Sequence, residues 1–166
     1  MTSFYGDSKE EKPHNAPKPL GKEIYLRVFV DFDHARDKTN RCSRTGYIIF
    51  MNMSMIYWHT KKQATIKGSV FGADVFAMKQ GVESLRGIRY KLLIMGVEVA
   101  GPTYIYGDNM SVIHNTSNPE YVLKKKSNSI CCHSVRKSVA MKECLKTHVP
   151  ALKNLADLLT KVLSGN

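Results

Sequence analysis

The chain has 166 residues, of which 43% are hydrophobic, a length and composition that predict one globular domain with its own apolar core. It carries 25 Lys and Arg against 14 Asp and Glu, a formal net charge of +11. This surplus favours a polyanionic partner such as nucleic acid, with a merely soluble basic protein as the simpler alternative. No apolar run is long enough to cross a bilayer and no apolar signal-peptide core is present near the start, so nothing favours secretion or membrane insertion.

Residues 1–21 are polar and include Pro13, Pro17 and Pro19, a composition that cannot form much core. We interpret this segment as a linker or tail, and residues 22–166 as the folded domain.

Residues 23–33 predict a strand with one apolar face. The apolar residues occupy the even positions: Ile24, Leu26, Val28, Val30 and Phe32. The opposite face ends in two carboxylates, Asp31 and Asp33. After a basic loop, GYIIFMN and SMIYW predict two more strands, so the first three strands form an antiparallel meander. We expect Trp58, in the third strand, to pack in the core rather than to stack on a base.

From about Val70 to Met95 the apolar residues recur at three- and four-residue steps, which predicts a long amphipathic helix. The expected buried stripe is Phe71, Val75, Met78, Val82, Leu85, Ile88, Leu92 and Met95. Asp74 lies on or beside this stripe, where a lone carboxylate is costly without a partner.

Gly101 and Pro102 break the chain, and TYIYGD then predicts a fourth strand ending at Asp108. A short helix follows, and either Asp108 or Asn109 can cap it. The basic run LKKKSNS leads to a helix over about 127–142.

The segment LKTHVP predicts a short fifth strand, and NLADLLTKVL a last helix with Asn154 as its N-cap. The order β-β-β-α-β-α-α-β-α, with a carboxylate at the carboxyl end of a strand that follows a helix, indicates a mixed α/β sheet.

Four aspartates stand out, and each has a simpler explanation. Asp108 can be a helix cap, Asp31 a solvent-facing strand end, and Asp157 a favourable charge near a helix start. Asp74 has the weakest alternative, because it lies on a buried face.

If the first and fourth strands are neighbours, these four carboxylates form one cluster. They cannot all stay ionised at close range unless cations neutralise them, and hard divalent cations with oxygen ligands do so. Two metal ions about 4 Å apart can activate a water and stabilise the leaving oxygen of a phosphodiester. The sequence thus favours a metal-dependent nuclease.

Seven segments occur in an order typical of one family: VDFDHARDK, SRTGYIIF, IYWHTKKQ, FGADVFAMKQ, IYGDNMSVI, LKKKSNSI and NLADLLTK. Together they resemble the ribonuclease H domain of copia-type long-terminal-repeat retrotransposon Pol polyproteins, over about residues 20–163. Residues 1–21 then correspond to the tail of an upstream reverse transcriptase domain.

The resemblance implies a ribonuclease H-like fold: a five-stranded mixed sheet, made of a three-stranded antiparallel meander and two parallel strands, flanked by helices. It implies hydrolysis of the RNA strand of an RNA–DNA hybrid with two Mg²⁺ ions, or Mn²⁺ as a substitute. It also implies a polyprotein with reverse transcriptase and integrase parts, in cytoplasmic virus-like particles or the nucleus.

Carried over by position, the four acids of the family correspond to Asp31, Asp74, Asp108 and Asp157, as both metal ligands and catalytic residues. The family typically has glutamate where this chain has Asp74. The shorter side chain reaches less far, and Mg²⁺ tolerates little error around ligand distances of about 2.1 Å. His133 and His148 are candidates for a histidine that assists product release, although a half-buried helix position is the favoured explanation of His133.

Five lysines are candidates for salt-sensitive, sequence-independent phosphate contacts: Lys61, Lys62, Lys124, Lys125 and Lys126. A solvated face is the simpler explanation of any one of them. We expect Asn109 to contact the nucleic acid near the metal site, where 2′-hydroxyl groups distinguish RNA from DNA.

Three alternatives remain open beside the active nuclease. One is a nucleic-acid-binding remnant with weak or no catalysis, which is compatible with an aspartate instead of a glutamate at position 74. An integrase or transposase core fits less well, because its third acid comes from a later helix. The sequence neither supports nor excludes a host-coopted interaction protein.

The four cysteines, Cys42, Cys131, Cys132 and Cys144, form no CxxC pair, which argues against a zinc site. We interpret them as reduced packing residues of an intracellular protein.

Overall fold

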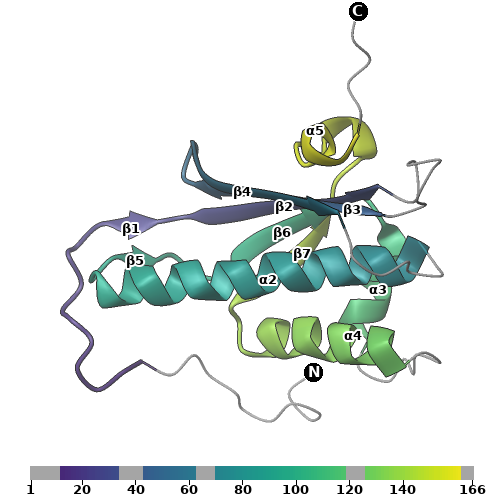
Figure 1. Cartoon of the computed structure of the whole chain (residues 1–166). Helices are drawn as coiled ribbons and strands as arrows, with labels where there is room; N and C mark the ends of the chain where they lie inside the picture. The colour runs from purple at the N-terminus through teal and green to yellow at the C-terminus, as the bar shows by residue number, and fades with distance from the viewer. Residues whose placement is uncertain (1–11, 34–42, 63–69, 119–125, 162–166) are drawn as a thin grey trace, which may run out of the picture.

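The computed structural model describes residues 12–33, 43–62, 70–118 and 126–161. Their centre is a five-stranded sheet in the order β4-β3-β2-β6-β7 (Figure 1). The strands are β2 (Leu26–Asp33), β3 (Arg44–Met51), β4 (Ser54–Lys62), β6 (Thr103–Gly107) and β7 (Cys144–His148).

The predicted mixed sheet is confirmed. β2 pairs antiparallel with β3, and β3 pairs antiparallel with β4, which gives the meander. β6 pairs parallel with both β2 and β7. The carboxyl ends of β2, β6 and β7 therefore meet at one edge of the sheet.

The helices lie mostly on one side of the sheet. α2 (Val70–Ile94), α3 (Met110–Ser117) and α4 (Lys126–Ala140) cover one face, while α5 (Asp157–Thr160) lies over one end of the other face (Figure 1). No helix in the described ranges is long and apolar enough to cross a membrane.

The core forms between β2 and α2, as the two apolar patterns predict. Leu26, Val28 and Val30 of β2 are buried, as are four residues of the α2 stripe: Val75, Met78, Val82 and Leu85. α2 approaches β2 closely at Gly81, where a Cβ would lie 2.8 Å from Val30 Cγ1. Met95 was predicted wrongly, because it follows the end of α2 and is 65% exposed.

The prediction that Trp58 packs in the core is wrong, because its side chain is 59% exposed. β4 is an edge strand, and Trp58 lies on the sheet face opposite α2, which only α5 covers among the described elements. A continuous apolar run such as MIYW does not show which faces of the strand other elements cover.

A two-stranded parallel sheet of β1 (Glu23–Ile24) and β5 (Glu98–Val99) was not predicted. The expected strand over 23–33 is interrupted at Tyr25, whose backbone N–H donates to Asn52 Oδ1. Two-residue strands carry no periodic signal, so only the tertiary pairing defines them.

The end of the chain differs from its prediction. A 3₁₀ turn, η1 (Ala151–Lys153), precedes a short α5 that begins at Asp157. Asn154 is not the N-cap of that helix. It is buried, its side-chain amide donates to the carbonyl of Val30 at 2.9 Å, and its Oδ1 accepts from Ala156 N at 3.2 Å. Asn154 therefore anchors the turn before α5 to β2.

Three cysteines lie in the described ranges, and none of the three forms a disulfide: Cys131, Cys132 and Cys144. Cys132 and Cys144 are fully buried, and burial raises the pKa of their thiols to about 11 and about 12. They are protonated packing residues at neutral pH, as expected. Cys42 lies outside the described residues.

Candidate metal centre

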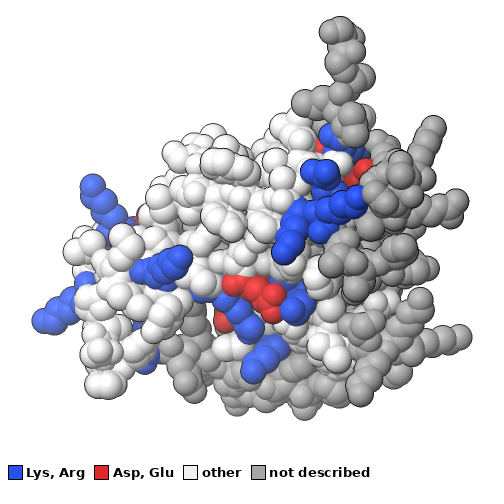
Figure 2. Space-filling view, viewed as in Figure 1, with Lys and Arg blue, Asp and Glu red and all other residues white. Residues whose placement is uncertain are grey.

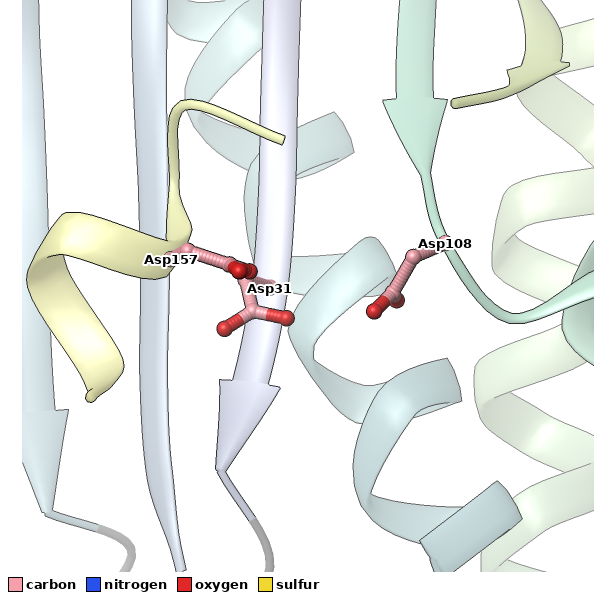
Figure 3. A group of neighbouring side chains, drawn as sticks. All are labelled: Asp31, Asp108 and Asp157. Carbon is pink, nitrogen blue, oxygen red and sulfur yellow. The ribbon is translucent and has the colours of Figure 1, made fainter. Parts of the chain in front are cut away.

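Three of the four selected aspartates meet at the edge where β2 and β6 end. Asp31 is near the end of β2, Asp108 directly follows β6, and Asp157 is the first residue of α5. One carboxylate oxygen from each lies within 4.8 Å of the others. Figure 3 shows Asp157 beside Asp31, with Asp108 pointing toward them from the neighbouring strand.

Asp31 is the most enclosed of the three, with 5% of its surface exposed. Its Oδ2 accepts a hydrogen bond from the hydroxyl of Thr160, in α5. Burial raises the pKa of the Asp31 carboxyl, and the negative charges of Asp157 and Asp108 raise it further. The site thus holds carboxylates that repel each other in a poorly solvated place.

Only one of the two carboxylate oxygens of Asp157 has a partner among the described residues. Its Oδ2 pairs with the ammonium of Lys161, four residues later. Its Oδ1 is buried and has no hydrogen-bond partner among the described residues. A buried carboxylate oxygen without a partner is costly, and it is the arrangement expected where a cation supplies the missing contact.

These residues fit a hard divalent cation. All three donors are carboxylates, which suit Mg²⁺ or Mn²⁺ rather than softer metals. Asp31, Asp108 and Asp157 are the residues that would hold it.

Asp74 stands apart from this group of three but faces the same place. It lines a small pocket together with Asp31, Asp108 and Asn109. Burial, followed by the charges of Asp108 and Asp31, raises the pKa of Asp74 to about 7, against a hydrogen bond that lowers it. That bond comes from the side-chain amide of Asn109, at 2.5 Å from Asp74 Oδ2.

Asn109 therefore has two structural tasks. Its Oδ1 accepts from the backbone N–H groups of Ser111 and Val112, at 2.9 and 3.3 Å, which caps α3. Its amide orients Asp74. Since Asn109 is the cap, the alternative that Asp108 serves as the cap does not hold.

Two residues of the site were not selected from the sequence, Thr160 and Lys161. They lie three and four residues after Asp157, the spacing that places side chains on one side of a helical turn. This spacing within ADLLTK is the signal that could have identified them.

Lys61 and Lys62 are exposed at the end of β4, next to Arg44 in the paired strand. Lys and Arg side chains gather on the surface beside α5 (Figure 2). Lys124 and Lys125 lie outside the described residues, as does the side chain of Lys126, the first residue of α4. His133 is half-buried in α4, as expected, and His148 is exposed at the end of β7.

The chain is similar in sequence to polyproteins of mobile elements. It is 30% identical over 144 residues to the retrovirus-related Pol polyprotein from transposon RE1 of Arabidopsis thaliana, a match covering 87% of this chain and 10% of the polyprotein. The chain spans about a tenth of the length of the curated relatives it matches. No protein-family model matches it.

Two solved structures with a similar fold are ribonucleases H. LC11-RNase H1 in complex with an RNA/DNA hybrid has a TM-score of 0.62 at 14% identity, covering 81% of this chain and 93% of that one. The N-terminal RNase H domain of a Mycobacterium tuberculosis protein has a TM-score of 0.61 at 13% identity, covering 82% and 91%. At these identities the likeness concerns the fold alone.

Proposed function

Because its homologues are retrovirus-related Pol polyproteins from transposons and its fold is ribonuclease H-like, we propose that this chain is a divalent-metal-dependent ribonuclease H. It hydrolyses the RNA strand of RNA–DNA hybrids during reverse transcription of a copia-type retrotransposon. Mg²⁺ is its cofactor, with Mn²⁺ as a substitute.

The meeting of Asp31, Asp108 and Asp157 is the observation that carries this proposal. The three carboxylates come from three separate elements, and burial disfavours the charge of Asp31. Asp157 also has a buried oxygen with no partner among the described residues. Such a group gains little as a purely structural cluster, but it suits a bound cation.

Bound divalent ions supply an activated water and stabilise the leaving oxygen of the cleaved phosphodiester. Other residues of the chain hold the carboxylates in place. Thr160 orients Asp31 through its hydroxyl, and Asn109 orients Asp74 through its amide. Lys161 compensates part of the negative charge of Asp157.

The substrate and partners follow from charge and ancestry. A net charge of +11 suits a polyanionic hybrid, and we assign phosphate contacts to Lys61, Lys62 and the lysines at 124–126. The matched polyproteins are much longer, so we propose reverse transcriptase and integrase parts as partners. Residues 1–21 would connect to the reverse transcriptase, inside a cytoplasmic particle or the nucleus.

A second candidate is a binding remnant with weak or no cleavage. It is favoured by the position of Asp74, which belongs to α2 and lies outside the group of three carboxylates. An aspartate at this position pairs with Asn109 instead of reaching the other acids.

The two candidates are separated by incubating the domain with a labelled RNA–DNA hybrid in Mg²⁺, in Mn²⁺ and in EDTA. We expect metal-dependent cleavage of the RNA strand that Asp31→Asn abolishes. If wild type binds the hybrid without cutting it, the remnant is correct. The variant Asp74→Glu then shows whether a longer side chain at this position, able to reach the other acids, restores cleavage.

A further inference from the structure

The sheet face opposite α2, α3 and α4 carries a group of aromatic side chains that the metal centre does not use. We name it the aromatic face, and it consists of Phe29, Phe50, Trp58, Tyr104 and Tyr106. The strand register places these residues on one side of the sheet, since Phe29 pairs with both Ile48 and Tyr106, and Ile48 pairs with Trp58. Among the described elements only α5 lies over this side, at one end (Figure 1).

Four of the five rings contact one another. Phe29 stacks on Tyr106 with ring centroids 4.8 Å apart, and it meets Phe50 edge-on at 5.8 Å. Tyr104 continues the group from Tyr106 at 6.4 Å. Tyr104 is 46% exposed and Trp58 is 59% exposed, so two broad ring surfaces face solvent.

Cations lie at both ends of this face, one beside Phe50 and two at the α5 end, next to the metal centre. The guanidinium of Arg27 lies 5.9 Å from the centre of the Phe50 ring. Arg44 and Lys62 are paired in register with each other at the α5 end. Among the residues of the five-stranded sheet that the register places on this side, only Asp31 and Asp33 are acidic, and both are at the end of β2.

We propose that the aromatic face binds single-stranded nucleic acid, with bases stacked on Tyr104 and Trp58 and phosphates near Arg27. Exposed rings on one sheet face, combined with cations, are the means by which sheet proteins bind single strands without sequence preference. Tyr104 is on β6 and Trp58 on β4, so stacked bases would span the two strands between them. Phe29 is two residues before Asp31, about 7 Å along β2, so a bound strand could lead directly from this face to the metal centre.

A nucleic acid suits the centre of this face better than a protein does. The middle strands β3, β2 and β6 contribute four rings and Arg27, while the outer strand β4 contributes Trp58 and Met55 and the outer strand β7 contributes Leu145. Flat bases match rings without needing complementary side chains, and a polyanion matches the charge.

The test measures binding by fluorescence anisotropy, with labelled single-stranded RNA and DNA of about 12 nucleotides, in EDTA so that no cleavage occurs. We expect Tyr104→Leu and Trp58→Leu each to weaken binding by about tenfold, the loss of one stacked base. Tyr104→Phe keeps the ring and should bind like wild type. Tyr90→Leu is the matched control, because Tyr90 is 55% exposed but belongs to α2.

Two results overturn the proposal. One is unchanged binding in Tyr104→Leu and Trp58→Leu, or an equal loss in Tyr90→Leu. The other is a concentration-dependent dimer in sedimentation that these substitutions abolish, which would assign the face to a protein contact. Circular dichroism and melting of each variant verify folding.

The outcome is separable from that of the proposed nuclease. Blunt-ended hybrid cleavage is measured in parallel, and we expect the leucine variants to cleave it at the wild-type rate. Binding of single strands through the aromatic face can hold even if the domain cleaves nothing.

Discussion

Asp108 is not needed to cap α3, because Asn109 accepts the backbone N–H groups at that helix start. Its carboxylate instead faces Asp31 and Asp157. We therefore predict that Asp108→Asn abolishes metal-dependent cleavage of a hybrid and leaves the melting temperature unchanged or slightly higher, since one repelling charge is removed. Gel assays of cleavage and thermal melting check the two parts. A drop of several degrees would mean that Asp108 supports the fold.

At Asp74 the raised pKa gives a dependence of stability on pH in the metal-free protein. The pKa is about 7 in the folded chain against 3.8 as the ordinary value, so the folded state binds more protons between them. Protonated Asp74 therefore contributes to the free energy of unfolding below about pH 4, and this contribution is lost as pH rises toward 7. At pH 7 about half of the wild-type molecules therefore carry a charged, half-buried carboxylate at Asp74, and the charged fraction grows above pH 7.

We predict that Asp74→Asn stabilises the metal-free protein at pH 7.5 by roughly 1 to 3 kcal/mol, since each pKa unit corresponds to about 1.4 kcal/mol. At pH 4 the difference should vanish. Urea unfolding in EDTA across this range measures it, and the exposed Glu83→Gln provides a control for loss of a carboxylate on α2. A pH-independent difference would contradict the prediction.

At the scale of elements, the position of α5 decides whether the metal centre exists. Gly46 of β3 allows α5 to lie directly on the sheet, because a Cβ there would be 2.8 Å from Thr160 Cγ2 and 2.9 Å from Leu159 Cβ. Thr60 of β4 donates to the carbonyl of Leu159 at 2.8 Å. These contacts hold Asp157 and Thr160 over Asp31.

We predict that Gly46→Ala displaces α5 and lowers hybrid cleavage at least tenfold, while the cost to the whole fold stays within about 1–3 kcal/mol. The matched control is Gly87→Ala in α2, where a Cβ meets nothing within 4 Å. That variant should keep full activity and gain a little stability, because alanine favours a helix. Wild-type cleavage by Gly46→Ala would show that α5 need not lie so close.

For the whole molecule, the clustered carboxylates couple folding to metal binding. Ions that bind only the folded state stabilise it, by about 2.7 kcal/mol at a concentration of 100 Kd. We predict that saturating Mg²⁺ raises the melting temperature by roughly 5–10 °C for a domain of this size. Differential scanning calorimetry measures the shift, and in Asp31→Asn it should fall to less than half. An equal shift in that variant would place the bound ions elsewhere.

The elements that the sequence predicted well are those whose pattern repeats. The alternation in β2 and the three- and four-residue steps of α2 predicted the two surfaces that form the core. Predictions failed where the pattern is short or the partner is distant. Asn154 looked like a helix cap, yet it bonds to Val30, 124 residues earlier.

The sequence by itself predicted the mixed sheet and placed Asp31 and Asp108 at strand ends, because periodic burial and charge at strand ends are local properties. Only the tertiary structure decided how these carboxylates are held. It brought Thr160 onto Asp31 and left Asp157 with a buried oxygen lacking a partner in the described chain. It also paired Asp74 with Asn109 by a hydrogen bond and left Trp58 exposed. Contacts between separate elements and uncovered sheet faces produce no periodic pattern in the sequence.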